Sequence, residues 1–168
     1  MKQLQVVAIL LIIFSVSANG EFAAGKMYIG GSAWIYRDLT DYDGYELGYS
    51  QITIAPSFGY FIFDNGLMFG RLYYSKVSLD DGWGQDDPDA TIRFAAGGKL
   101  FIQSLYGGGS LQYSIIGSES YTGVIFEGGV LVPITDYFFV DLGADLYWGL
   151  SEDEYRDVRA KVGFATLF

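Results

Sequence analysis

The segment Thr91–Ile102, TIRFAAGGKLFI, alternates between two kinds of side chain. Apolar or small residues occupy every even position from Ile92 to Ile102, while Thr91, Arg93 and Lys99 fall on odd positions. In a β-strand, successive side chains point to opposite faces of the sheet. The segment therefore predicts a strand with one apolar face and one polar face.

The same alternation recurs along the chain and predicts seven further strands. The expected strands are 26–37, 47–62, 67–79, 91–102, 106–117, 123–133, 138–149 and 155–168. Short connections are expected at 64–66, 103–105 and 134–137, and mostly longer, more acidic ones at 38–46, 80–90, 118–122 and 150–154. An even number of antiparallel strands, with short turns at one end and longer loops at the other, is typical of outer-membrane barrels. We therefore expect an all-β fold, an eight-stranded antiparallel up-and-down transmembrane β-barrel.

The composition agrees with such a fold and excludes several kinds of chemistry. The hydrophobic fraction is 51%, the aromatic fraction 18%, and glycine is abundant at 23 residues, which favours aromatic strands and tight turns. The sequence has no cysteine and no histidine, so disulfides, thiolate metal sites and imidazole bases are excluded. The formal net charge of −10 argues against a nucleic-acid partner.

The first residues carry the pattern of an export signal. Lys2 is followed by an apolar run from Val6 to Val16 and by a small residue, Ala18. This run is shorter than the about 20 residues that a spanning helix needs. We expect a secretory signal peptide at residues 1–18 and a barrel domain at 19–168.

The two faces of the strands distinguish a membrane barrel from a soluble one. A secreted lipocalin-like barrel that binds a small apolar ligand would have its apolar face inside. In a membrane barrel the polar face is inside, and its charges must then be paired. The predicted interior contains Lys26, Arg71, Arg93, Lys99, Arg159, Lys161, Glu127, Asp141 and Asp145, supported by Gln51, Gln112, Ser110, Tyr28, Tyr73 and Tyr147. We expect Asp145 to pair with Arg159 or Lys161, because their strands are joined by a short loop.

Aromatic residues near the strand ends predict two interfacial girdles. The residues expected at one rim are Trp34, Tyr36, Tyr74 and Trp148, and those at the other are Phe58, Tyr60, Phe138 and Phe168.

Two stretches carry a resemblance to a known family. ITIAPSFGYFIFDNGLMFGRLYYS resembles the strand–turn–strand unit of small OmpA/OmpX-like outer-membrane β-barrel proteins, and GGVLVPITDYFFVDLGADLYW repeats that layout more loosely. The final KVGFATLF resembles the C-terminal assembly signal of outer-membrane proteins, with Lys161, Gly163 and the terminal Phe168. Thr166 departs from it, since that position is usually aromatic or bulky. The resemblance implies eight strands, insertion by the outer-membrane assembly machinery, no cofactor, and a last strand that closes against the first.

The expected function follows from the predicted membrane location and from the kinds of chemistry that the sequence excludes. Enzymes among the small outer-membrane barrels use a histidine, so we expect no enzymatic activity and no catalytic, cofactor-binding or metal-binding residues. Eight strands enclose a lumen that side chains fill, which leaves at most a narrow, low-conductance channel as an alternative. We expect an integral protein of the cell outer membrane with a structural or surface-interaction role. Its expected partners are outer-membrane lipid, lipopolysaccharide, the assembly machinery and an unidentified extracellular ligand, and the chain is expected to be a monomer.

The expected loops hold most of the acidic residues. They lie in the stretches RDLTDYDGYE, LDDGWGQDDPDA and SEDEYRD, at 37–46, 79–90 and 151–157. Clustered carboxylates can bind Ca²⁺, but the spacing matches no EF-hand loop. A solvated, mutually repulsive surface is the simpler interpretation.

Overall fold

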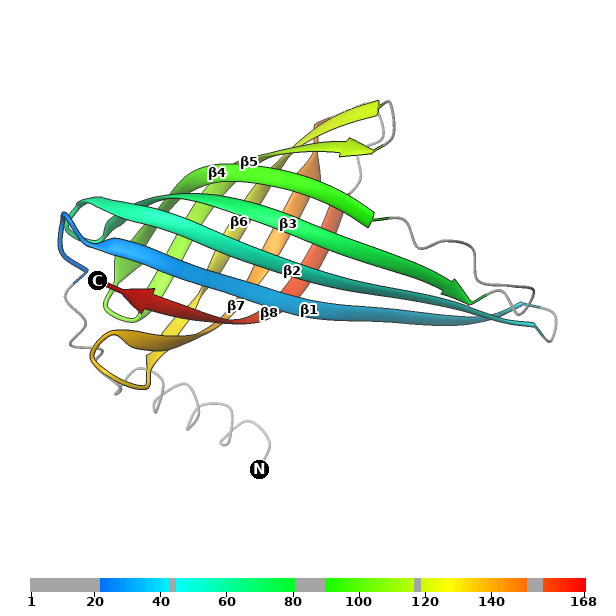
Figure 1. Ribbon diagram of the computed structural model, residues 1–168, viewed down its shortest axis with the longest axis horizontal. Helices are drawn as coiled ribbons and strands as arrows, with labels where there is room; N and C mark the ends of the chain where they lie inside the picture. The colour runs from blue at the N-terminus through cyan, green and yellow to red at the C-terminus, as the bar shows by residue number, and fades with distance from the viewer. Residues whose placement is uncertain (1–21, 43–44, 81–89, 117–118, 151–155) are drawn as a thin grey trace.

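The computed structural model describes residues 22–42, 45–80, 90–116, 119–150 and 156–168. These residues form a closed antiparallel barrel in which each strand pairs with its neighbours in sequence (Figure 1). The strands are β1 (Met27–Tyr42), β2 (Tyr45–Phe63), β3 (Gly66–Asp80), β4 (Ala90–Ile102), β5 (Leu105–Ile116), β6 (Glu119–Pro133), β7 (Phe138–Gly149) and β8 (Arg156–Leu167). The predicted fold class, an eight-stranded antiparallel β-barrel, is confirmed. Among the described residues, no helix has the length and apolar character needed to cross a membrane.

The barrel closes where the last strand meets the first. β8 pairs with β1 from Tyr28–Leu167 to Ala33–Val162. Beyond this ladder, the backbones of Met27 and Phe168 exchange two hydrogen bonds, with N···O distances of 3.1 and 3.2 Å. The expected contact between first and last strands is therefore present, and Phe168 contributes its backbone to it.

Two of the expected long connections are wrong. The pairing of β1 with β2 continues to Tyr42–Tyr45, and β6 begins at Glu119, so most of 38–46 and 118–122 is strand. The acidic residues in these stretches suggested loops. Backbone pairing with an adjacent strand does not depend on apolar side chains, and the ladder simply continues. In Figure 1 the β1–β2 hairpin reaches well beyond the rest of the barrel.

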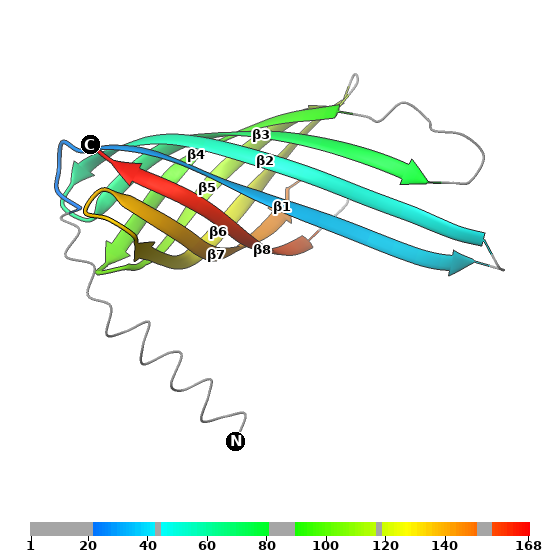
Figure 2. The ribbon, with the colours of Figure 1, turned by 60° about the horizontal axis from the view of Figure 1, so that its bottom comes forward.

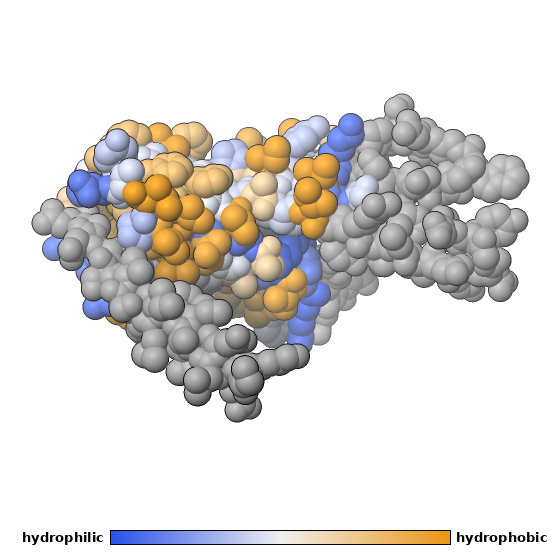
Figure 3. Space-filling view, turned by 90° about the horizontal axis from the view of Figure 1, so that it is seen from below, coloured by the Kyte–Doolittle hydropathy of each residue, from blue (hydrophilic) through white to orange (hydrophobic). Residues whose placement is uncertain are grey.

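The direction of the side chains follows the predicted alternation. Phe94 is 58% exposed whereas its neighbour Ala95 is 6% exposed, and Ile54 is 53% exposed whereas Thr53 is fully buried. Figure 3 shows apolar residues gathered across the outer surface, with hydrophilic residues towards both ends. Charged and hydroxyl side chains, among them Arg71, lie buried inside. The apolar face is therefore the outer face.

The two ends of the barrel differ in their connections. The turn end carries the short connections Asp64–Asn65 and Gln103–Ser104, and the loop end is the opposite one, where β3 and β7 end and β4 and β8 begin. Asn65 and Gln103 have φ angles of 64° and 56°, in the left-handed region that such tight turns need.

Candidate functional site

The lumen of the barrel contains the buried polar and charged side chains. The side chains that point into it form three layers along the barrel axis. The layer at the turn end is apolar and is built around Phe22, which precedes β1. The ring centroid of Phe22 lies 4.6 Å from that of Phe101, 5.8 Å from that of Phe61 and 6.1 Å from that of Phe139. The other buried members of this layer are Tyr28, Leu67, Phe69, Tyr106, Leu131, Ala165 and Leu167.

Backbone contacts fix Phe22 in this position. The carbonyl of Phe22 accepts a hydrogen bond from the N–H of Asn65 at 2.7 Å, and the N–H of Ala24 donates to the Asp64 carboxylate at 2.9 Å. The segment before β1 is thus attached to the β2–β3 turn, and its aromatic ring packs into the turn end of the lumen.

The sequence analysis did not predict this apolar layer, although a signal for it was present. Phe101 ends the otherwise polar face of TIRFAAGGKLFI, and Phe61 and Phe139 take equivalent inward positions near the ends of β2 and β7. Inward aromatic residues at the same end of several strands indicate a closed end of the barrel.

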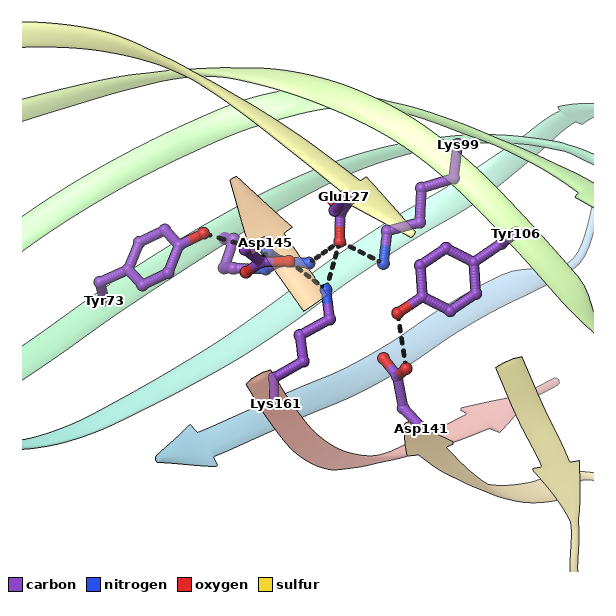
Figure 4. Close-up of polar contacts among 8 residues, drawn as sticks. Tyr73, Lys99, Tyr106, Glu127, Asp141, Asp145 and Lys161 are labelled. Carbon is purple, nitrogen blue, oxygen red and sulfur yellow. Dashed lines mark hydrogen bonds and ion pairs between the residues drawn. The ribbon is translucent and has the colours of Figure 1, made fainter. Parts of the chain in front are cut away.

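The middle layer is an ionic cluster centred on Glu127 (Figure 4). Its Oε2 atom lies 2.9 Å from Nη2 of Arg71, 3.0 Å from Nζ of Lys99 and 2.7 Å from Nζ of Lys161. Asp145 takes part through Lys161, at 2.6 Å, and through Arg71, at 3.7 Å. The predicted pairing of Asp145 with Lys161 is confirmed.

Asp141 completes the charge balance of the middle layer. Its carboxylate accepts a hydrogen bond of 2.6 Å from the hydroxyl of Tyr106. A Cβ atom on either Gly129 or Gly143 would lie 2.7 Å from that hydroxyl, so the two glycines provide the space for the ring of Tyr106. Arg71, Lys99 and Lys161 are thereby matched by the carboxylates of Glu127, Asp145 and Asp141. Such matching is what a buried charge cluster requires.

The layer nearest the loop end contains Arg93 and Arg159 together with aromatic rings. The guanidinium carbon of Arg93 lies 5.7 Å from the ring centroid of Tyr73, and that of Arg159 lies 5.6 Å from Trp34. The Trp34 and Tyr73 rings meet edge to face at 5.9 Å. Arg159 was the other partner expected for Asp145. It donates instead from Nε to Asp157.

Two assignments from the sequence need correction, one to the interior and one to an outer rim. Lys26 lies before β1 and is half-buried, so it belongs to the end of the barrel and not to the ionic cluster. Trp34 was expected at an outer rim but packs inside against Tyr73, because it shares the inward face of β1 with Tyr28 and Ser32. Of the remaining predicted rim residues, Tyr74, Trp148, Phe58, Tyr60 and Phe168 have exposed side chains. The side chain of Tyr36 lies outside the described residues.

The acidic stretches considered for divalent cations lie almost entirely outside the described side chains. Within the described part of the chain, no group of three or more carboxylates could hold a metal ion.

The comparisons with known proteins support the fold. No protein-family model matches the sequence, and none of the curated proteins matches it. Among solved structures, the chain is similar to the outer membrane protein OprG from Pseudomonas aeruginosa, with a TM-score of 0.58 and 14% sequence identity over 89% of this chain and 98% of that one. At this identity the similarity concerns the fold, so the chain shares the barrel architecture of an outer membrane protein.

Proposed function

We propose that this chain is an integral β-barrel protein of a Gram-negative-type outer membrane, with a structural or surface-interaction role and a lumen filled by side chains. The observation that carries the proposal is the inverted distribution of side chains. The outer face is apolar, as at Phe94 and Ile54, while Arg71, Lys99, Glu127, Asp141, Asp145 and Lys161 lie buried inside. A barrel surrounded by water would leave these apolar residues exposed without a partner.

The dimensions of the barrel fit this location. The strands contain between 12 and 19 residues, and a tilted strand needs about 9–11 residues to cross the hydrocarbon layer. Pairing of β1 with β8 provides hydrogen-bond partners for backbone N–H and C=O groups of these two strands, which lipid cannot provide. The fold shared with OprG supports the same location.

Side chains fill the lumen at the turn end and in the middle, which argues against a role that needs passage through the barrel. The Phe22 layer occupies the turn end, and the ionic cluster occupies the middle. We therefore assign interaction with other molecules to the outer surface and the loop end. The proposal includes a cleaved signal peptide at 1–18, insertion by the outer-membrane assembly machinery, contact with lipopolysaccharide, and a monomeric state. The extracellular ligand stays unidentified.

Fractionation of cells tests the proposed location. The protein should sediment with outer membranes, resist extraction by carbonate or urea, and dissolve only in detergent. Recovery in the buffer-soluble fraction after lysis would contradict the proposal and would favour the lipocalin-like alternative. Recordings in planar bilayers test the filled lumen, since a large, stable current would show a channel.

A further inference from the structure

We propose that Arg93 and Arg159 form a binding site for a phosphate group at the loop end of the lumen. This inference goes beyond the proposed function, because it assigns a ligand to the interior layer nearest the loops. Two neighbouring layers of the lumen differ in how many of their buried cations are paired with described carboxylates.

The middle layer has a carboxylate for every cation, whereas the described part of the layer above it has one carboxylate for two guanidinium groups. Arg71, Lys99 and Lys161 are matched by Glu127, Asp145 and Asp141. In the layer nearest the loop end, the described carboxylate is that of Asp157, and it pairs with Arg159. Among the described residues, Arg93 makes no ion pair, and its buried Nε has no hydrogen-bond partner. A guanidinium held away from bulk water needs a counter-charge, and no described carboxylate supplies one to Arg93.

The neighbouring residues hold Arg93 in place without neutralising it. Its Nη2 donates to Oγ of Ser75 at 2.6 Å, and that oxygen lies 2.8 Å from Oγ1 of Thr53. The ring of Tyr73 covers one face of the guanidinium, with its centroid 5.7 Å from Cζ. This arrangement orients Arg93 while leaving Nε free to donate.

Arg159 contacts the same aromatic pair, and its Nη1 and Nη2 donate to no acceptor within the described residues. Its ring contact is Trp34, which touches Tyr73 edge to face. Its hydrogen bond to Asp157 uses Nε, and its side chain is 19% exposed. Arg93 comes from β4 and Arg159 from β8, so the two guanidinium groups reach the lumen from different sides of the barrel.

The chemistry of two separated guanidinium groups favours phosphate over carboxylate. A carboxylate has two oxygens in one plane, which one arginine can occupy fully. A tetrahedral phosphate presents three or four oxygens and can accept from two arginines that approach from different directions. Its charge would also neutralise the guanidinium of Arg93, which pairs with no described carboxylate.

The test uses the folded chain in detergent micelles and follows the Nε–Hε signals of arginine by NMR. The Arg93 signal is assigned by its loss in Arg93→Lys. Inorganic phosphate is titrated against chloride at constant pH and ionic strength. The proposal expects a saturable shift of the Arg93 signal, and an affinity weakened about tenfold or more in Arg159→Gln. The absence of a saturable shift would overturn it.

Lys76→Gln is the matched control, because Lys76 is exposed on the outer face of β3 next to Ser75. It removes the same charge without touching the site, so its phosphate affinity should stay close to that of the unchanged chain. An equal loss in Lys76→Gln and Arg159→Gln would mean general electrostatics and would overturn the site. Equal binding of acetate would overturn the assignment to phosphate.

Two further titrations distinguish a lipid headgroup from the free ion as the source of the phosphate group. Lipid A with its phosphates, and lipid A from which they have been removed, are added in place of inorganic phosphate. A shift with phosphorylated lipid A alone supports a site for a lipid headgroup, and a shift with inorganic phosphate alone supports a site for the free ion. No shift with any phosphate would contradict the proposal.

Discussion

Glu127 is the residue on which the charge balance of the lumen depends most. One of its oxygens contacts Arg71, Lys99 and Lys161. Glu127→Gln should lower the free energy of unfolding by about 3–5 kcal/mol, because it leaves buried cations without their carboxylate. Urea unfolding of the refolded protein in lipid vesicles measures this loss.

Two further variants separate lost pairing from a general charge effect. Asp136→Asn removes a carboxylate from the exposed β6–β7 turn and should change the stability little. The double variant Glu127→Gln with Lys99→Met should recover part of the loss, because it removes a cation together with the anion. No recovery in the double variant would count against the cluster as the origin of the effect.

A pair of leucines tests the environment of the outer face at single residues. Leu142 and Leu150 are 40% and 59% exposed and lie on β7 and just after it, at the middle and the loop end of the barrel. Leu142→Arg should cost about 2–4 kcal/mol, because it places a charge near the bilayer midplane, and Leu150→Arg only about 0–1 kcal/mol. Unfolding in vesicles compares the two variants. Similar costs at both positions would indicate that water, and not lipid, surrounds the middle of the barrel.

At the scale of elements, the contact between β1 and β8 is the weakest part of the barrel wall. The ladder ends at Ala33–Val162, although β1 continues to Tyr42 and β8 starts at Arg156. Figure 2 shows β8 separating from β1 towards the loop end. The β8 amides that face β1 should therefore exchange faster between Arg156 and Lys161 than between Val162 and Leu167. Hydrogen exchange followed by NMR measures this, and uniform protection along β8 would contradict a ladder that ends at Val162.

The segment before β1 is a second element with a testable role. Phe22 is 3% exposed and stacks on Phe101. Phe22→Ala should destabilise the barrel by about 3–5 kcal/mol, because it leaves a cavity in a packed apolar layer. Phe164→Ala is the matched control, since its ring is on the outer face, where mobile neighbours can fill the space. Equal losses, measured by thermal unfolding in detergent, would mean that Phe22 does not pack in the lumen.

For the whole molecule, the sequence predicted the strands and their two faces far better than the contacts between side chains in the lumen. Alternation was sufficient to find eight strands and their two faces, because the period of two follows directly from strand geometry. The partner of Asp145 was also predictable, since Lys161 lies on the next strand. The contact of Glu127 on β6 with Arg71 on β3 was not, because it crosses the lumen and depends on the width and stagger of the closed barrel. Trp34 was misplaced for a related reason, since aromatic residues serve both the outer rims and the interior.

The central claim for the whole molecule is that the apolar outer face contacts lipid. The sequence has no cysteine, so single cysteines can carry a spin label at outward positions such as Phe94, Leu142 and Val162. In vesicles, electron paramagnetic resonance compares collisions with oxygen, which dissolves in lipid, and with a water-soluble nickel complex. The lipid-embedded barrel predicts that oxygen reaches all three labels more readily than nickel does. Greater access for nickel at these positions would contradict it.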